Sequence, residues 1–217
     1  MDWQAKLAWA GAEHERRLAV AVGPDEREDL RLASIAGASW AAGLAALMLG
    51  RDDEARDRLL RAAGEYETSW RAAPAGSWGR PIAMIRCRLM AGDHEGARAG
   101  ASAAVADGVL DAPGPIGGYC AALALLALGR DEDAGNVAGR VADEGLQPAS
   151  VADALGTIAR ADGAAYVAAR LAVLRSFEER DAFLEDVRVA DTVLVLDALA
   201  LERGLELPPL PSPLLPG

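Results

Sequence analysis

The sequence predicts an all-α protein, and three observations support that prediction. A nine-residue pattern occurs three times, as LMLGRDDEA from Leu47 to Ala55, LMAGDHEGA from Leu89 to Ala97 and LALGRDEDA from Leu126 to Ala134. Apolar residues on both sides of each copy recur in steps of three and four, which matches the 3.6-residue period of an α-helix. Each copy also places a glycine one or two residues before acidic residues, as expected where one helix ends and the next begins.

The N-terminal region predicts two helices before the first copy of the pattern. The first runs from Trp3 to Val22, carries charges on one side and is halted by Gly23 and Pro24. The second runs from Asp25 to Leu49. Its segment from Ala33 to Gly50 has no charged residue, but alanine, glycine and serine dominate it and drive membrane insertion weakly. We therefore expect a buried helix there, with the first helix capping the stack.

Three helical hairpins are expected at residues 36–71, 78–107 and 116–145. In each hairpin the leading helix ends at a glycine, Gly50, Gly92 or Gly129, which can take the left-handed conformation that closes a helix. The acidic residues that follow suit the positive dipole end and the unpaired amide groups of the next helix. Together these features give each hairpin a stop signal and a start signal.

The hairpins resemble the tetratricopeptide repeat (TPR), in which two helices flank a short glycine-containing turn and small residues occupy the helix crossing. Family-like alanines lie five residues after the turn glycines, at Ala55, Ala97 and Ala134. Gly43 fits the mid-helix glycine of the family, whereas Ile85 and Ala122 depart from it. The spacings of 42 and 37 residues exceed the usual family period of about 34. The resemblance covers about residues 36–145 and implies a short right-handed α-α superhelix, a TPR-like solenoid with capping helices.

The C-terminal part should remain helical before a proline-rich end. Helices are expected at about Val151 to Arg160, Ala164 to Glu179 and Thr192 to Arg203, within a region 150–203 of degenerate repeats or a closing cap. The β-propensity of residues 192–196 would also allow a short strand there, but we prefer a helix. The Pro/Leu-rich tail, residues 204–217, favours extended backbone. It has PxxP spacing, but packing of its leucines on the last helices is preferred over a proline-motif ligand. We expect one helical-repeat domain over residues 1–217.

The net charge of the chain indicates which classes of partner it is expected to bind. The chain has 33 acidic and 22 basic residues, giving a formal charge of −11, which repels phosphate backbones and anionic lipid surfaces. We therefore expect no nucleic-acid and no membrane partner. Charges such as Lys6 and Glu13 interrupt any secretory signal at the N-terminus, and Cys87 and Cys120 have no neighbour that would make a metal or redox motif. A reducing, cytoplasmic location fits these features.

No motif in the sequence indicates catalysis. The two histidines, His14 and His94, lack the spacing of a metal site, and the acidic clusters are explained by helix starts. No nucleophile elbow and no glycine-rich phosphate loop is present. We therefore expect no catalytic residues, no metal and no cofactor, and we expect that the protein is not an enzyme.

The resemblance implies a concave groove lined by the leading helices. The candidate partner-binding residues are Trp40, Met48, Ile82, Arg86, Met90 and Tyr119. Aromatic residues, arginine and methionine are enriched at interfaces, although plain core packing explains the same pattern equally well. The leading hypothesis is a non-enzymatic protein- or peptide-binding scaffold, with homodimerisation left open. The alternatives are an acidic inhibitor or immunity-type protein that neutralises a basic partner and, least favoured, an enzyme with an unrecognised active site.

Overall fold

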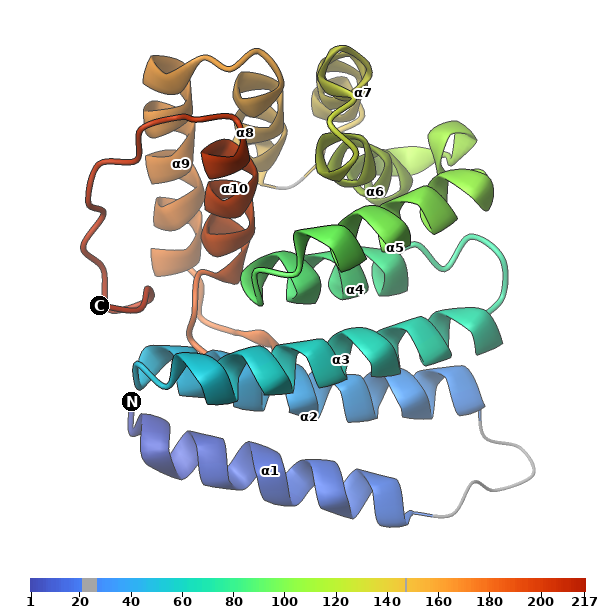
Figure 1. Ribbon diagram of the computed structural model, residues 1–217, viewed down its shortest axis with the longest axis vertical. Coiled ribbons are helices and arrows are strands. Elements are labelled where there is room, and N and C mark those ends of the chain that lie inside the picture. The colour runs from blue at the N-terminus through green and yellow to red at the C-terminus, as the bar shows by residue number, and fades with distance from the viewer. Residues whose placement is uncertain (21–26, 147) are drawn as a thin grey trace.

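The computed structural model describes residues 1–20, 27–146 and 148–217. Within these residues it contains ten α-helices, two 3-10 helices and no strand, which confirms the predicted all-α class (Figure 1). The elements are α1 (Trp3–Ala19), α2 (Glu28–Met48), α3 (Asp52–Ala72), α4 (Gly79–Met90), α5 (His94–Ala106), η1 (Val109–Asp111), α6 (Gly114–Ala127), α7 (Asp131–Asp143), α8 (Ala149–Ala159), α9 (Gly163–Glu178), η2 (Leu184–Asp186) and α10 (Asp191–Glu202).

Most predicted helices are confirmed to within a few residues. The three expected hairpins coincide with α2–α3, α4–α5 and α6–α7, and the three expected C-terminal helices coincide with α8, α9 and α10. Residues 192–196 are helical, so the strand alternative is wrong. The predicted halt at Gly23 and Pro24 and the predicted helix start at Asp25 lie outside the described residues.

The helices stack in chain order. Each helix from α1 to α9 packs on the next, with α1 at one end of the stack and α8 and α9 at the other (Figure 1). Of the described helices, only α2 is long and apolar enough to cross a membrane, and 67% of its apolar window is buried inside the fold. That burial is expected of a core helix packed between α1 and α3.

The turns within the hairpins share one geometry. Gly50, Gly92 and Gly129 have φ values of 67°, 68° and 70°, which confirms them as left-handed helix stops. In each turn the glycine amide and the next amide donate to carbonyls of the preceding helix. Ala161, between α8 and α9, has φ 50° and makes the same pair of hydrogen bonds. The fold therefore contains a fourth hairpin turn of this kind, with alanine in place of glycine.

Small residues allow close contact between helices. A Cβ atom added to Gly43 of α2 would lie 2.7 Å from Cγ of Leu59 on α3, so only glycine fits this crossing. Ala55, Ala97 and Ala134 are all completely buried. An alanine-rich sequence with few aromatic residues can therefore still form a continuous core, because its helices approach closely.

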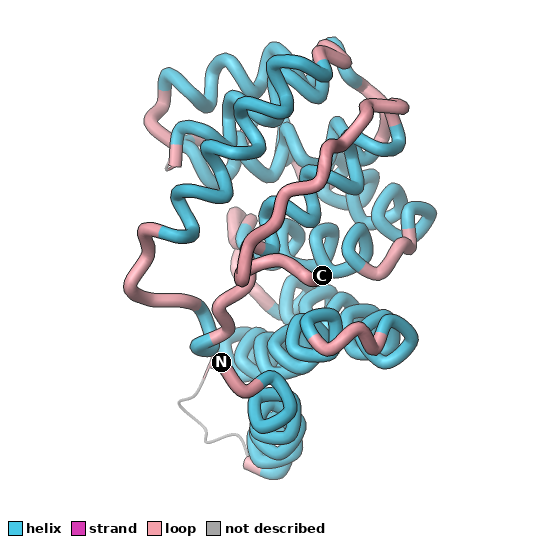
Figure 2. Tube along the Cα trace, turned by 90° about the vertical axis from the view of Figure 1, so that its left-hand side faces the viewer, coloured by secondary structure: helices cyan, strands magenta, loops and turns pink. Residues whose placement is uncertain are grey.

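The segment after α9 folds back onto the earlier helices. We call residues 179–190, which join α9 to α10, the strap; its η2 turn contacts α2, and α10 packs against α4, α8 and α9. Figure 2 shows the tail as a long loop that crosses the C-terminal helices and ends beside the strap. The tail leucines Leu214 and Leu215 are buried, so the tail packs on the protein itself as expected.

A candidate binding cavity beneath the strap

A cavity of about 190 Å³ lies where the strap crosses the inner side of the first helices. Helices α2, α3 and α4 form one wall, and the end of α9, the strap and the start of α10 form the other. The side chains that dominate its chemistry are Trp40, Tyr66, Arg86, Phe177, Arg180 and Phe183. The cavity therefore combines an aromatic lining with two guanidinium groups.

Two of the six predicted groove residues line this cavity. Trp40 comes from α2 and Arg86 from α4, the leading helices of the first two hairpins. Trp40 lies ten residues before Gly50, and Arg86 lies six residues before Gly92. The helical period places both on the face that points toward the inside of the stack. The structure brings them together across the α3 residue Tyr66.

The other four predicted residues lie outside the cavity lining. Ile82 and Tyr119 are buried in the core, and Met48 and Met90 are half-buried and pack against its edge. Burial raises the pKa of the Tyr119 hydroxyl, and the Arg86 guanidinium opposes that shift, so Tyr119 lies within the electrostatic reach of Arg86.

Arg86 is held by an ion pair from the C-terminal segment. Its terminal nitrogen donates to the Asp191 carboxylate and, at 3.3 Å, to the Thr192 hydroxyl, while its Nε is buried without a hydrogen-bond partner among the described residues. Burial opposes the charge on Arg86, but Asp191 and nearby buried groups more than offset it, so the pKa of the guanidinium lies above its usual value. Arg86 therefore stays charged and keeps one donor unused.

Two further arginines lie over aromatic rings at the other wall. The Arg180 guanidinium lies 3.8 Å from the centroid of the Phe177 ring, and that of Arg188 lies 5.6 Å from the Phe183 centroid. Among the residues that the structure describes, no carboxylate lies within ion-pair distance of Arg180. Burial lowers the pKa of the Arg180 guanidinium. The Asp191 carboxylate opposes this lowering, and the positive charge of Arg86 increases it.

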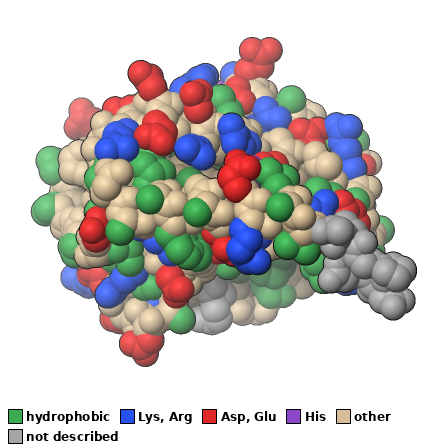
Figure 3. All heavy atoms as spheres, turned by 90° about the horizontal axis from the view of Figure 1, so that it is seen from below, with side chains coloured by type: hydrophobic (Ala, Val, Ile, Leu, Met, Phe, Trp, Pro, Cys, Tyr) green, Lys and Arg blue, Asp and Glu red, His purple; other side chains and the backbone are tan. Residues whose placement is uncertain are grey.

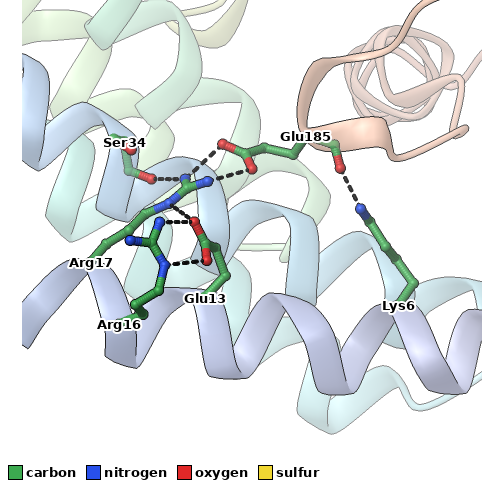
Figure 4. Close-up of polar contacts among 6 residues, drawn as sticks. All are labelled: Lys6, Glu13, Arg16, Arg17, Ser34 and Glu185. Carbon is green, nitrogen blue, oxygen red and sulfur yellow. Dashed lines mark hydrogen bonds and ion pairs between the residues drawn. The ribbon is translucent and has the colours of Figure 1, made fainter.

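Glu185 fixes the strap to α1 (Figure 4). Both carboxylate oxygens of Glu185 accept hydrogen bonds from Arg17, at 2.7 and 2.9 Å, and its carbonyl oxygen accepts one from the Lys6 ammonium. A Cβ on Gly37 would lie 3.0 Å from the Glu185 carboxylate, so glycine makes room for it on α2. Glu185 and Asp186 both have φ 51°, a left-handed conformation that costs about 1–3 kcal/mol per non-glycine residue. The ion pair opposes that strain.

Two observations bear on the chemistry available at the cavity. Cys87, next to Arg86 in the sequence, is buried, and burial raises the pKa of its thiol to about 12, so the thiol is not a nucleophile near neutral pH. Across residues 1–20, 27–146 and 148–217, no three His, Cys, Asp or Glu side chains gather in a way that could hold a metal ion.

Comparison with known proteins gave no match. No family model, no curated protein and no solved structure matches this chain. The role of the cavity must therefore be argued from its own geometry.

Sequence reasoning missed the second wall of the cavity. Phe177, Arg180, Phe183 and Asp191 are roughly a hundred residues away from Arg86 in the chain, and no repeat copy contains them. One signal was available: in the segment 177–188 aromatic residues and arginines alternate at short spacing, a combination that is enriched at binding surfaces.

Proposed function

We propose that this chain is a non-enzymatic scaffold that binds a protein or peptide, with a TPR-like right-handed superhelix that presents the cavity beneath the strap as its anchor site. The observation that carries the proposal is the cavity itself, in which Trp40 and Arg86 meet aromatic and cationic side chains. Tryptophan, tyrosine and arginine are the residue types that most often dominate binding energy at interfaces.

The regularity of the turns supports the TPR-like part of the proposal. Four hairpins share the left-handed turn and its two hydrogen bonds, and in three of them a fully buried alanine follows the turn glycine by five residues. In this arrangement α1 caps one end of the stack. The segment after residue 179 covers part of the concave side, and the cavity is the place where that cover leaves space.

The size of the cavity defines what a partner would insert. A volume of 190 Å³ equals the liquid volume of about six water molecules. Pockets that bind drug-sized molecules are larger, starting at about 300 Å³. One side chain or a small molecule fits, whereas a nucleotide-sized cofactor does not. The partner would therefore place a single anchor group here and make its other contacts on the surrounding surface.

The test fills the cavity while leaving the ion pair intact. Arg86→Ala is unsuitable because it leaves Asp191 buried without its partner, a change that typically costs about 3–5 kcal/mol. Ala83→Leu instead adds volume at a half-buried position of the cavity wall, and Ala99→Leu, at an exposed position on α5, is the matched control.

The three proteins are used to capture partners from a lysate of the native cell, and binding is then remeasured with the purified partner. We expect a partner that binds the wild type and Ala99→Leu equally and Ala83→Leu at least tenfold more weakly. Equal binding to all three proteins would refute the role of the cavity, and failure to capture any partner would count against the scaffold proposal.

The alternative function, inhibition of a basic partner, is favoured by the charge of −11. On the face formed by α1, however, acidic and basic side chains alternate among apolar ones and form no single-sign field (Figure 3). The two proposals differ in salt dependence: neutralisation of a basic partner should weaken steeply between 50 and 500 mM salt, whereas anchoring in a buried cavity should not. Either role would be carried out in the cytoplasm, where both cysteines would stay reduced.

A further inference from the structure

We infer that the anchor group of this cavity is a carboxylate carried on a short apolar or aromatic stem. The inference rests on the proposed function in that it assigns a ligand chemistry to the same cavity. Its three supports are the local charge, an arginine that has no ion-pair partner among the described residues, and the aromatic lining.

The charge around the cavity is opposite in sign to that of the protein. Two arginines, Arg86 and Arg180, line it, with Asp191 as the acidic residue of the lining, and Arg188 stands at the Phe183 side of the same wall. The strap carboxylate of Glu185 also acts on Tyr66 of the lining, but it is paired with Arg17 on α1. An anion that enters would therefore meet excess positive charge in a place partly shielded from water, where charge interactions are strongest.

The two arginines of the lining differ in their partners. Arg86 is held by the Asp191 carboxylate. Arg180 lies against the Phe177 ring and has no ion-pair partner among the described side chains. A bound carboxylate would form an ion pair with Arg180 and neutralise it. Each guanidinium offers a planar set of N–H donors that suits a carboxylate.

The remaining lining is apolar and shapes the stem of the ligand. Trp40, Tyr66 and Phe183 contribute aromatic surfaces, and Leu184 and Val187 of the strap add aliphatic ones. A bare inorganic anion would leave these surfaces in contact with water, whereas a ring or branched chain next to the carboxylate would cover them. With about 190 Å³ available, a stem of one ring or a few carbon atoms fills the space.

The test measures binding of phenylacetate to the full chain by titration calorimetry, with neutral phenylacetamide as the matched probe. Arg180→Gln removes the charge of a side chain that makes no ion pair with the described residues, and Arg175→Gln, at an exposed position on α9, is the control variant. We expect phenylacetate to bind the wild type and Arg175→Gln equally, and Arg180→Gln at least tenfold more weakly. Phenylacetamide should bind at least tenfold more weakly than phenylacetate. Binding of the acid and the amide with equal affinity would overturn the inference.

A second probe separates the two sources of such a carboxylate, a free small acid and an acidic side chain of a protein partner. It is an alanine-rich pentapeptide with one central glutamate and blocked ends. Tighter binding of phenylacetate would identify a free acid as the ligand, and tighter binding of the peptide would identify a protein partner. In either case the affinity should fall in Arg180→Gln. If neither probe binds, the inference is overturned. If partner capture remains sensitive to Ala83→Leu while both probes fail, only the ligand chemistry is wrong. If phenylacetate binds and no partner is captured, only the scaffold proposal fails.

Discussion

Replacement of Gly43 by alanine should destabilise the protein, although alanine is the better helix former. The added Cβ would lie 2.7 and 2.9 Å from Cγ and Cδ2 of Leu59 and 3.3 Å from its backbone nitrogen. Leu59 is completely buried and cannot move aside without displacing α3. Overpacking of a core costs about 1–3 kcal/mol and the helix-propensity gain returns about 1 kcal/mol. Because a backbone atom is among the contacts, we expect a net loss of about 1–2 kcal/mol in the free energy of unfolding.

Urea unfolding of three variants checks this prediction. Gly64 lies at an exposed position inside α3, where an added Cβ meets no atom within 4 Å, so Gly64→Ala should gain about 0.5–1 kcal/mol. In a Leu59→Ala background, which removes the side chain that the new Cβ would meet, Gly43→Ala should become neutral or stabilising. Equal stability of Gly43→Ala and Gly64→Ala in the wild-type background would show that α2 and α3 are not in this close contact.

Three further predictions concern the turns, the surface charges and the cysteines. Ala161→Gly should raise the free energy of unfolding by about 1 kcal/mol in urea titrations, because glycine adopts φ 50° without the steric cost that alanine bears. Hydrogen bonds from Arg16 and Arg17 lower the pKa of Glu13 from 4.5 to about 2. The contribution of Glu13 to stability is therefore complete above pH 4.5 and is lost as the pH falls from 4.5 to 2. The unfolding midpoint of Glu13→Gln should vary less with pH in that window than the midpoint of the wild type. Burial raises the pKa of the Cys87 and Cys120 thiols to about 12, so a colorimetric thiol reagent at pH 8 should react with both only after denaturation.

Local signals predicted the helices because the relevant interactions are local. Gly92 ends α4 with a positive φ, and the next residue, Asp93, accepts a hydrogen bond from the Gly96 amide at the start of α5. Both effects act within a few residues, so a glycine followed by acids locates the boundary without knowledge of the rest of the fold. The buried alanine stripes identified the packed faces for the same reason.

The break between Arg160 and Ala164 was predicted, but the left-handed geometry of this fourth turn was not, because alanine occupies the left-handed position. Ala161 carries no sequence signal for a helix stop, yet Asp162 caps the next helix by accepting from the Ala165 amide, as Asp93 does in the second hairpin. Packing of α8 against α9 stabilises a turn that the local sequence alone disfavours. Tertiary contact therefore overrides local propensity at this position.

The cavity was only half predictable, because its second wall depends on contacts between distant parts of the chain. Trp40 and Arg86 follow from helical periodicity, but Arg17 and Glu185, which fix the strap over them, are 168 residues apart. No short-range pattern encodes that pairing. The strained φ of 51° at Glu185 is held by hydrogen bonds from Arg17 and Lys6 on α1, not by the local sequence.

The tail does not line the cavity, but it helps to hold the second wall in place. Arg170 binds the Asp197 carboxylate at 2.6 and 2.7 Å and donates to the Pro208 carbonyl at 2.8 Å, which fixes the start of the tail on α9 and α10. Near the other end of the tail, the Leu214 carbonyl accepts a hydrogen bond from the Ala190 amide at 2.8 Å. The residue after Ala190 is Asp191, the partner of Arg86, so the tail helps to place the carboxylate that holds the cavity arginine. The repeat-like hairpins alone would supply Trp40 and Arg86 on an open face, and the last forty residues convert that face into a cavity with a defined charge.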